Sequence, residues 1–332
     1  MANYIGTLNQ LSKPGVIDTD IQKALLTNNA LYWAMAGKPD FKGKAKAKPK
    51  IKEETMTGTG YFETYILLDE NDNIGWVDAS EGLDVETLTF GDRPKIPIQS
   101  LVGTIPLPTR DLDLNNANTE RLVKLTTLAI TQAQQTAVNK VSAGLFYVGT
   151  EYGAKGPYGL QYYLPNTVTS GSVAGISQAD KANWRSYVKD AGSGSFATYA
   201  TEYIDVMLNE CTYGGDSPDL LVFGKTNYGR FKKLLQLNQR YTDVSEITKA
   251  GFRNLEYAGA GCIMDGNQTT GVIHAVDTKY AELAFVKGCN FKIGKWVEPT
   301  NEQYMSAKLT ARLNMLFKSR KSSGKIRGFT TV

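Results

Sequence analysis

The chain has 332 residues, of which 42% are hydrophobic and 21% charged, and a formal net charge of +4. These proportions are those of a globular protein long enough for about two domains, and they argue against disorder. The charge is too small for a uniformly basic nucleic-acid binder, so such a role would depend on local clusters. Three cysteines without paired spacing indicate reduced thiols in a protein made in the cytoplasm. The sequence lacks the apolar run of a membrane span and the pattern of a secretory signal.

Near the N-terminus, residues 18–36 carry apolar side chains at helical spacing and end at Gly37, which predicts an amphipathic helix. The next segment alternates lysine with other residues, at Lys42, Lys44, Lys46, Lys48, Lys50 and Lys52. In an extended chain this period of two places all six ammonium groups on one side. The strip is interpreted either as a cationic surface for phosphate or an acidic neighbour, or as a solvated edge strand that resists aggregation.

Residues 61–68 and 74–90 have the composition of strands on either side of a polar turn at residues 69–73. The turn has calcium-ligand residue types, but Ile74 and Ser80 stand where a calcium loop needs Gly and Glu. We therefore expect a long, exposed β-hairpin and no calcium site. An isolated hairpin is marginal in water, so its apolar side chains need another surface to cover them. These candidate inter-subunit residues are Ile66, Leu68, Trp76 and Val77.

The prolines in residues 94–108 favour an edge strand or a bent extended structure. The longest predicted helix follows at residues 118–145 and would span about 42 Å. Its apolar side chains form one stripe, made of Leu122, Leu125, Ala129, Ala133, Ala137, Val141 and Leu145. This pattern predicts a structural spine whose stripe packs on a core and binds no cofactor.

Beyond a Gly, Pro and Ser-rich loop at residues 157–186, helical patterns at 201–215 and 226–241 alternate with strand patterns, which predicts a mixed α/β domain. The final run, residues 304–329, begins as an alternating strand and ends in a basic cluster. This cluster consists of Lys318, Arg320, Lys321, Lys325 and Arg327. Because the run has only the spine region to pack on, we expect the chain to return to its first domain after inserting a second.

The chain offers few catalytic side chains. His274 is the only histidine and lies in an apolar strand pattern, so we interpret it as a structural residue and not as a general base. The cysteines lack metal-ligand spacing, and the sequence contains neither a Walker loop nor a complete dinucleotide fingerprint. We therefore predict no metal and no cofactor, while an α/β enzyme with an unrecognised site stays open as an alternative.

The loop at residues 157–186 contains a "GL" step, a Thr-Val pair and a "GIS" ahead of Trp-Arg. The residues concerned are Gly159, Leu160, Leu164, Thr167, Val168, Gly175, Ile176, Ser177, Trp184 and Arg185. This pattern resembles a signature region of tailed-bacteriophage major capsid proteins of the Hong Kong 97 fold. The order of the predicted elements resembles that family over nearly the whole chain. The resemblance implies a loop that neighbouring structure orders, and the alternative is a surface loop anchored by aromatic residues in its own domain. In both cases Trp184 is a structural anchor.

The resemblance implies an α+β fold of the Hong Kong 97 type, divided into five parts. They are an N-terminal arm (1–53), an extended hairpin loop (54–95), a peripheral domain with the spine helix (96–158), an axial domain (159–297) and a return to the peripheral domain (298–332). Some relatives carry a long scaffolding segment before the arm. Here only residues 1–53 precede the hairpin, so we expect scaffolding from another protein or from none.

The implied function is that of a structural subunit, not an enzyme. Pentamers and hexamers would form an icosahedral phage head around double-stranded DNA, in a virion whose subunits are made in the host cytoplasm. Scaffolding, portal and decoration proteins would be further partners, with no membrane, and a basic cluster would meet DNA or an acidic patch on a neighbour. Alternatives are an encapsulin-like compartment shell, the α/β enzyme, and a monomeric nucleic-acid binder.

Overall fold

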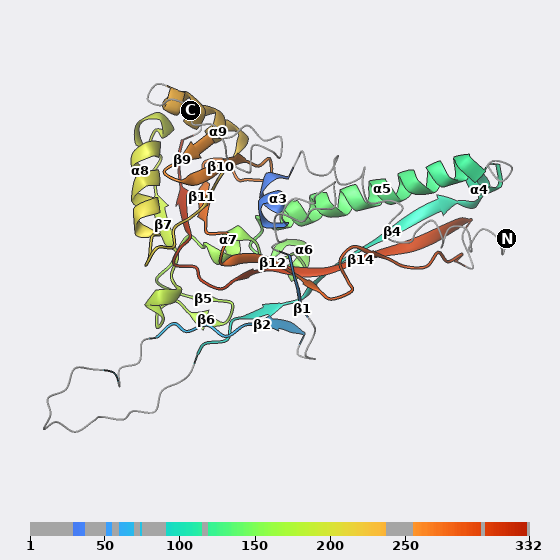
Figure 1. Cartoon of the computed structure of the whole chain (residues 1–332), viewed down its shortest axis with the longest axis horizontal. Coiled ribbons are helices and arrows are strands. Elements are labelled where there is room, and N and C mark those ends of the chain that lie inside the picture. Colours follow the sequence, from blue (N-terminus) through green and yellow to red (C-terminus); the bar gives the residue numbers. More distant parts are fainter. Residues whose placement is uncertain are drawn as a thin grey trace, which may run out of the picture.

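The computed structural model describes residues 29–36, 51–54, 60–69, 74, 91–114, 119–236, 255–299 and 303–330. Two sheets dominate the described part of the chain, one with five strands and one with six. Figure 1 shows the helix α5 running beside the long strands β4 and β14, with α8, α9 and the six-stranded sheet at the other end. This division agrees with the mixed α/β class expected from the sequence.

The five-stranded sheet is built on β14 (Tyr304–Phe317), which pairs with β4 (Gln99–Pro108) over ten residues in antiparallel register. On its other side β14 pairs with β12 (Ala281–Val286) and β13 (Lys292–Ile293), and β1 (Ile51–Glu54) adds to β12 in parallel. In the described part of the chain β4 is an edge strand. Its prolines are therefore tolerated, as the sequence predicted.

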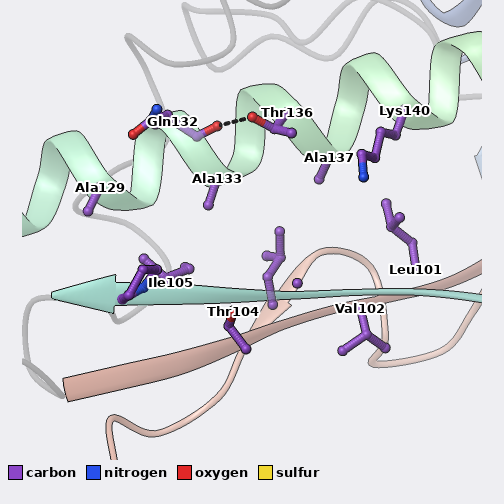
Figure 2. Close-up of a pocket in the computed structure, with 13 residues that line it drawn as sticks. Leu101, Val102, Thr104, Ile105, Ala129, Gln132, Ala133, Thr136, Ala137 and Lys140 are labelled. Carbon is purple, nitrogen blue, oxygen red and sulfur yellow. Dashed lines mark hydrogen bonds between the residues drawn. The ribbon is translucent and has the colours of Figure 1, made fainter. Parts of the chain in front are cut away.

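The helix predicted at residues 118–145 is observed as α5 (Thr119–Gly144), which would be about 39 Å long. It packs on one face of β4, and the short α4 (Thr109–Leu114) connects the two. Toward the C-terminal end of α5 the predicted stripe is buried, with Val141 fully inside the core. Ala133 is only half-buried, because small side chains leave a pocket of about 390 Å³ between the helix and β4 (Figure 2).

The six-stranded sheet has the order β7-β15-β11-β8-β10-β9. Its central strand β8 (Leu220–Phe223) is buried on both faces, which explains its uninterrupted apolar sequence. Leu221 and Phe223 point toward one core cluster with α8 (Phe196–Glu210) and α9 (Lys225–Gln236). Leu220 and Val222 point toward the core shared with α5. The other strands are β7 (Tyr187–Asp190), β9 (Leu255–Tyr257), β10 (Ala260–Met264), β11 (Ile273–Val276) and β15 (Gly324–Arg327).

The strand partners differ from the expected order of domains. A single return of residues 298–332 to the first domain would leave β15 outside the six-stranded sheet, yet β15 pairs with β7 and β11. Conversely, β12 and β13 lie before residue 298 and belong to the sheet with β4. The chain therefore crosses between the two sheets more often than the sequence indicated.

Two small hairpins lie beside the five-stranded sheet (Figure 1). One pairs β2 (Tyr61–Glu63) with β3 (Lys95–Pro97), and the other pairs β5 (Ser172–Val173) with β6 (Ile176–Ser177). The Lys95 N–H donates to the Ala174 carbonyl at 2.9 Å and links the two. Short helical segments complete the described chain at α6 (Glu151–Ala154), α7 (Leu160–Tyr163) and η1 (Ala182–Trp184).

The described part of the predicted N-terminal helix is α3 (Ala30–Ala36), which docks between the two halves of the molecule. Leu31 and Met35 are fully buried, and the Asn29 amide donates to Asn139 Oδ1 on α5 at 2.8 Å. At the start of the helix the Leu31 N–H donates to Asp265 Oδ2 at 3.0 Å. Asp265, which follows β10, therefore caps α3 and ties it to the six-stranded sheet.

We expect Asp265→Ala to lower the free energy of unfolding by about 1 to 2 kcal/mol, because it leaves the buried Leu31 N–H without an acceptor. Asp265 also accepts from the Asn267 N–H at 2.9 Å, which the same change removes. Urea unfolding of unassembled subunits measures the loss, with the exposed Asp180→Ala as control. Equal stability of both variants would show that the cap does not hold α3 in place.

Candidate assembly surfaces

The loop with the "GL" step begins directly against the C-terminal end of α5. The Gly159 N–H donates to the Tyr147 carbonyl at 3.0 Å, and the Leu160 N–H donates to the Leu145 carbonyl at 2.7 Å. A side chain at Gly159 would overlap the Leu145 carbonyl, so this close approach requires glycine. Leu160 is fully buried. The "GL" step is therefore hydrogen-bonded to the backbone that follows the C-terminal end of α5.

Trp184 anchors the far end of this loop, as expected from the sequence. It is fully buried, and its indole N–H donates to the Val173 carbonyl at 3.1 Å. The Arg320 guanidinium lies 5.4 Å from the Trp184 ring centroid and donates to the Tyr163 carbonyl at 2.6 Å and to Gln178 Oε1 at 3.0 Å. Burial lowers the pKa of Arg320 to about 10. A cation from the end of the chain thus holds both ends of the loop.

The C-terminal basic cluster does not form an exposed cationic surface. Arg320 and Lys325 are buried, and Lys325 Nζ donates to Asn166 Oδ1 at 2.8 Å. Burial also lowers the pKa of Lys325 to about 8. The expectation that Arg320 and Lys325 contact a partner outside the subunit is therefore wrong. The other three members pair inside the chain, Lys318 with Glu282, Lys321 with Asn183 and Arg327 with Asp190.

His274 is a core residue, as predicted. It is fully buried on β11, and its Nδ1 hydrogen-bonds the Gln268 side chain. Burial, with a smaller contribution from the charge of Lys325, lowers the pKa of His274 to about 3. Burial raises the pKa values of Cys211 and Cys262, so neither is a reactive thiolate. Within the described ranges, no three His, Cys, Asp or Glu side chains are placed to hold a metal ion.

The base of the predicted hairpin packs on its own subunit. Leu68 is buried, and Ile66 is half-buried against the same core cluster. The prediction that Leu68 covers a neighbouring subunit is therefore wrong, whereas the half-buried Ile66 leaves part of its surface exposed and the prediction for it stays open. The residues on the opposite face of this strand are exposed instead, since the exposed fraction is 69% for Tyr65 and 82% for Leu67. The strand alternation was recognised, but its faces were assigned the wrong way round.

Lys181 clamps the two strands of this hairpin base. Its ammonium group pairs with Asp69 on one strand and lies 3.6 Å from Asp92 on the other. Beside it, the Asn183 amide donates to the Leu68 carbonyl at 2.7 Å. These contacts tie the base of the hairpin to the loop at residues 157–186. Nothing in the sequence pairs this lysine with those two aspartates.

The remaining predicted contact residues lie outside the described part of the chain, among them Trp76, Val77 and Lys42 to Lys50. Lys52 lies in β1, whose backbone pairs in parallel with β12 at Ala284. The cationic strip therefore stays a prediction. Among the described helices, none has the length and apolar character needed to cross a membrane.

No protein-family model and no curated protein sequence matches this chain. Solved shell structures do match it. A chain of the cyanophage A-1(L) capsid is 15% identical, with a TM-score of 0.62 over 85% of this chain and 90% of that chain. A chain of the capsid of Myoviridae phage XM1 is 12% identical, with a TM-score of 0.52 over 84% and 90%. This chain has the tailed-phage major capsid fold.

The capsid fold is also found outside phages. A chain of the holo-SrpI encapsulin complex from Synechococcus elongatus is 8% identical, with a TM-score of 0.50 over 91% of this chain and 95% of that chain. These matches run across both sheets of the capsid fold and are not confined to one of them. The resemblance stated from the loop at residues 157–186 is therefore confirmed at the level of the fold.

Proposed function

We propose that the chain is the major shell subunit of a tailed-phage head, assembling as pentamers and hexamers into an icosahedral shell around double-stranded DNA. One observation carries this proposal: the likeness to the cyanophage capsid chain spans 85% of this chain and 90% of that one. The mechanism would be assembly and not catalysis. The subunit would be made in the host cytoplasm and act in the virion, with scaffolding, portal and decoration proteins as further partners.

In this proposal the five-stranded sheet and α5 form the peripheral domain, and the six-stranded sheet with α8 and α9 forms the axial domain. The hairpin at residues 54–95 would extend over a neighbouring subunit. Exposed apolar side chains on its described part support this role, namely Tyr65, Leu67 and Ile74, the last 79% exposed. The lysine strip from Lys42 to Lys52 would meet DNA or an acidic surface of a neighbour.

Replacing residues 70–90 with a short Gly-Ser linker tests the assembly role. The replacement leaves the buried Leu68 and the Lys181 clamp in place, so we expect a folded subunit with the parent's melting transition. The variant should form no closed shells, which negative-stain microscopy and sedimentation would measure. Global unfolding would place residues 70–90 in the core of their own subunit. Normal shells would remove the hairpin from assembly.

A compartment shell is the second candidate, favoured by the encapsulin likeness. Both shells would use the same contacts between copies, but their contents differ. Purified particles of a phage head would contain nucleic acid when packaging is complete, whereas a compartment shell would contain protein cargo. Absorbance ratios and nuclease-resistant nucleic acid in the particles distinguish the two.

A further inference from the structure

Where β4, β13 and the first part of β14 form the five-stranded sheet, one face packs under α5 and the opposite face is open. Along β14, Ala307, Leu309 and Ala311 are buried on the α5 side. The alternate residues Lys308 and Arg312 are exposed on the other side, as period-two alternation requires. β4 follows the same rule, so the open face continues across both strands.

The strand register gathers three cations on this open face. Lys292 on β13 lies directly opposite Thr310, and Lys308 and Arg312 flank Thr310 on β14. Lys292 is a diagonal neighbour of both and lies about 7 to 8 Å from each, whereas Lys308 and Arg312 are four residues apart on one strand and about 13 Å from each other. The Debye length at physiological salt is about 8 Å, so the repulsion is strongest between Lys292 and each of the other two cations. The residues opposite them on β4, Thr104 and Ser100, are uncharged. In the described part of the chain none of the three cations forms an ion pair.

Three like charges without a counter-charge repel one another, so the isolated subunit gains nothing from this arrangement. A partner that brings negative charge would remove the repulsion. The same face also exposes apolar side chains, Val102 by 50% and Val297 by 59%. A DNA backbone would satisfy the charges but would leave the valines uncovered. An acidic peptide with apolar residues fits both features.

The chain itself contains such a peptide. Residues 70–86 carry six carboxylates and no Lys, Arg or His. The carboxylates belong to Glu70, Asp72, Asp78, Glu81, Asp84 and Glu86. Between them stand apolar residues, of which the structure describes Ile74 as 79% exposed. The composition of this acidic segment complements the open face in both charge and apolar character.

We propose that Lys292, Lys308 and Arg312 form a cationic face that binds the acidic segment, residues 70–86, of a second copy of this chain. The proposal rests on the shell function and names the surface that the hairpin of a neighbour contacts. It also predicts that contacts between copies weaken as salt rises, because exposed charge pairs are screened.

A charge exchange tests this contact directly. The variant K292E/K308E/R312E should reduce shell yield about tenfold or more, and so should D72K/D78K/D84K, because each places like charges against each other. Combining the six substitutions restores opposite charges and should restore the parent's yield. The variant K155E/K225E/K287E makes the same change in net charge at exposed positions elsewhere and should assemble normally. If the combined variant folds with the parent's melting temperature yet stays unassembled, the contact is wrong.

A binding assay on unassembled subunits separates this proposal from the shell function. A fluorescent peptide of residues 70–86 should bind the parent and lose about tenfold in affinity to K292Q/K308Q/R312Q. An analogue with amides in place of the carboxylates should not bind. Equal affinity for parent and variant would overturn the proposal even if shells form. Binding of duplex DNA at these three residues, without peptide binding, would assign the face to nucleic acid. Peptide binding by a parent that never forms shells would reject the shell function alone.

Discussion

Replacing Arg320 with methionine is expected to lower the free energy of unfolding of the subunit by about 3 kcal/mol. The guanidinium is fully buried and donates to the Tyr163 carbonyl and to Gln178 Oε1. Methionine fills a similar volume but donates no hydrogen bond, so both buried acceptors lose their partner. Each such loss costs about 1 to 3 kcal/mol.

Arg320 differs from a member of a buried ion pair. Exchanging a complete buried ion pair for apolar residues is often neutral, because both charges leave together. Here the acceptors are a backbone carbonyl and a side-chain amide, which remain after the substitution. Arg320→Lys keeps the charge but not the forked donor geometry. Its free energy of unfolding should therefore lie between those of the parent and the methionine variant.

Urea unfolding of unassembled subunits measures these differences. Arg110→Met is the matched control, because Arg110 is exposed and its change should stay within about 0.5 kcal/mol. A methionine variant as stable as the parent would mean that Arg320 does not hold the loop at residues 157–186. Loss of stability without loss of shells would separate folding of the loop from assembly.

Hydrophobic periodicity made the secondary structure predictable. Helical spacing indicated α5, and short length with flanking Pro and Gly favoured a strand for the apolar run of β8. The prolines of β4 favoured an edge strand. The pattern does not say which strands pair. β12 and β15 are both short and mostly buried, yet they belong to different sheets, because pairing depends on contacts far apart in sequence.

Burial of charge was the second point that sequence reasoning missed. Arg320 and Lys325 stand in a run rich in Lys and Arg, and such runs are usually solvated. Both instead lie inside the subunit, where carbonyl and amide oxygens accept their hydrogen bonds. The inner and outer faces of the hairpin base were interchanged for a related reason. Alternation shows that Ile66 and Leu68 share a face, but it does not show which face packs on the core.

The open cationic face was equally invisible before the register was known. Lys292, Lys308 and Arg312 are separated by up to 20 residues, and only the pairing of β13 with β14 brings them together. The acidic segment, in contrast, is visible as composition alone. Once the fold shows that the three cations share one face, the acidic composition of residues 70–86 indicates which segment of a second copy binds there.

The subunit should lose stability in mild acid through His274, the only histidine of the chain. Its pKa is about 3 in the folded state and 6.5 in the unfolded chain, because burial disfavours the charged ring. As pH falls below 6.5 the unfolded chain takes up a proton that the folded state does not. The contribution of His274 to the free energy of unfolding is therefore fully present above pH 6.5. Between pH 6.5 and pH 3 this contribution falls by about 1.4 kcal/mol per pH unit.

His274→Gln removes the titrating group while keeping a side chain that can hydrogen-bond Gln268. The variant is expected to lose stability less steeply than the parent between pH 6.5 and pH 5, by about 2 kcal/mol over that range. Unfolding free energies at several pH values give the two slopes, and only their difference matters, since all carboxylates are common to both proteins. Parallel slopes would mean that the His274 ring stays accessible to protons in the folded subunit, which would contradict its place in the core of the six-stranded sheet.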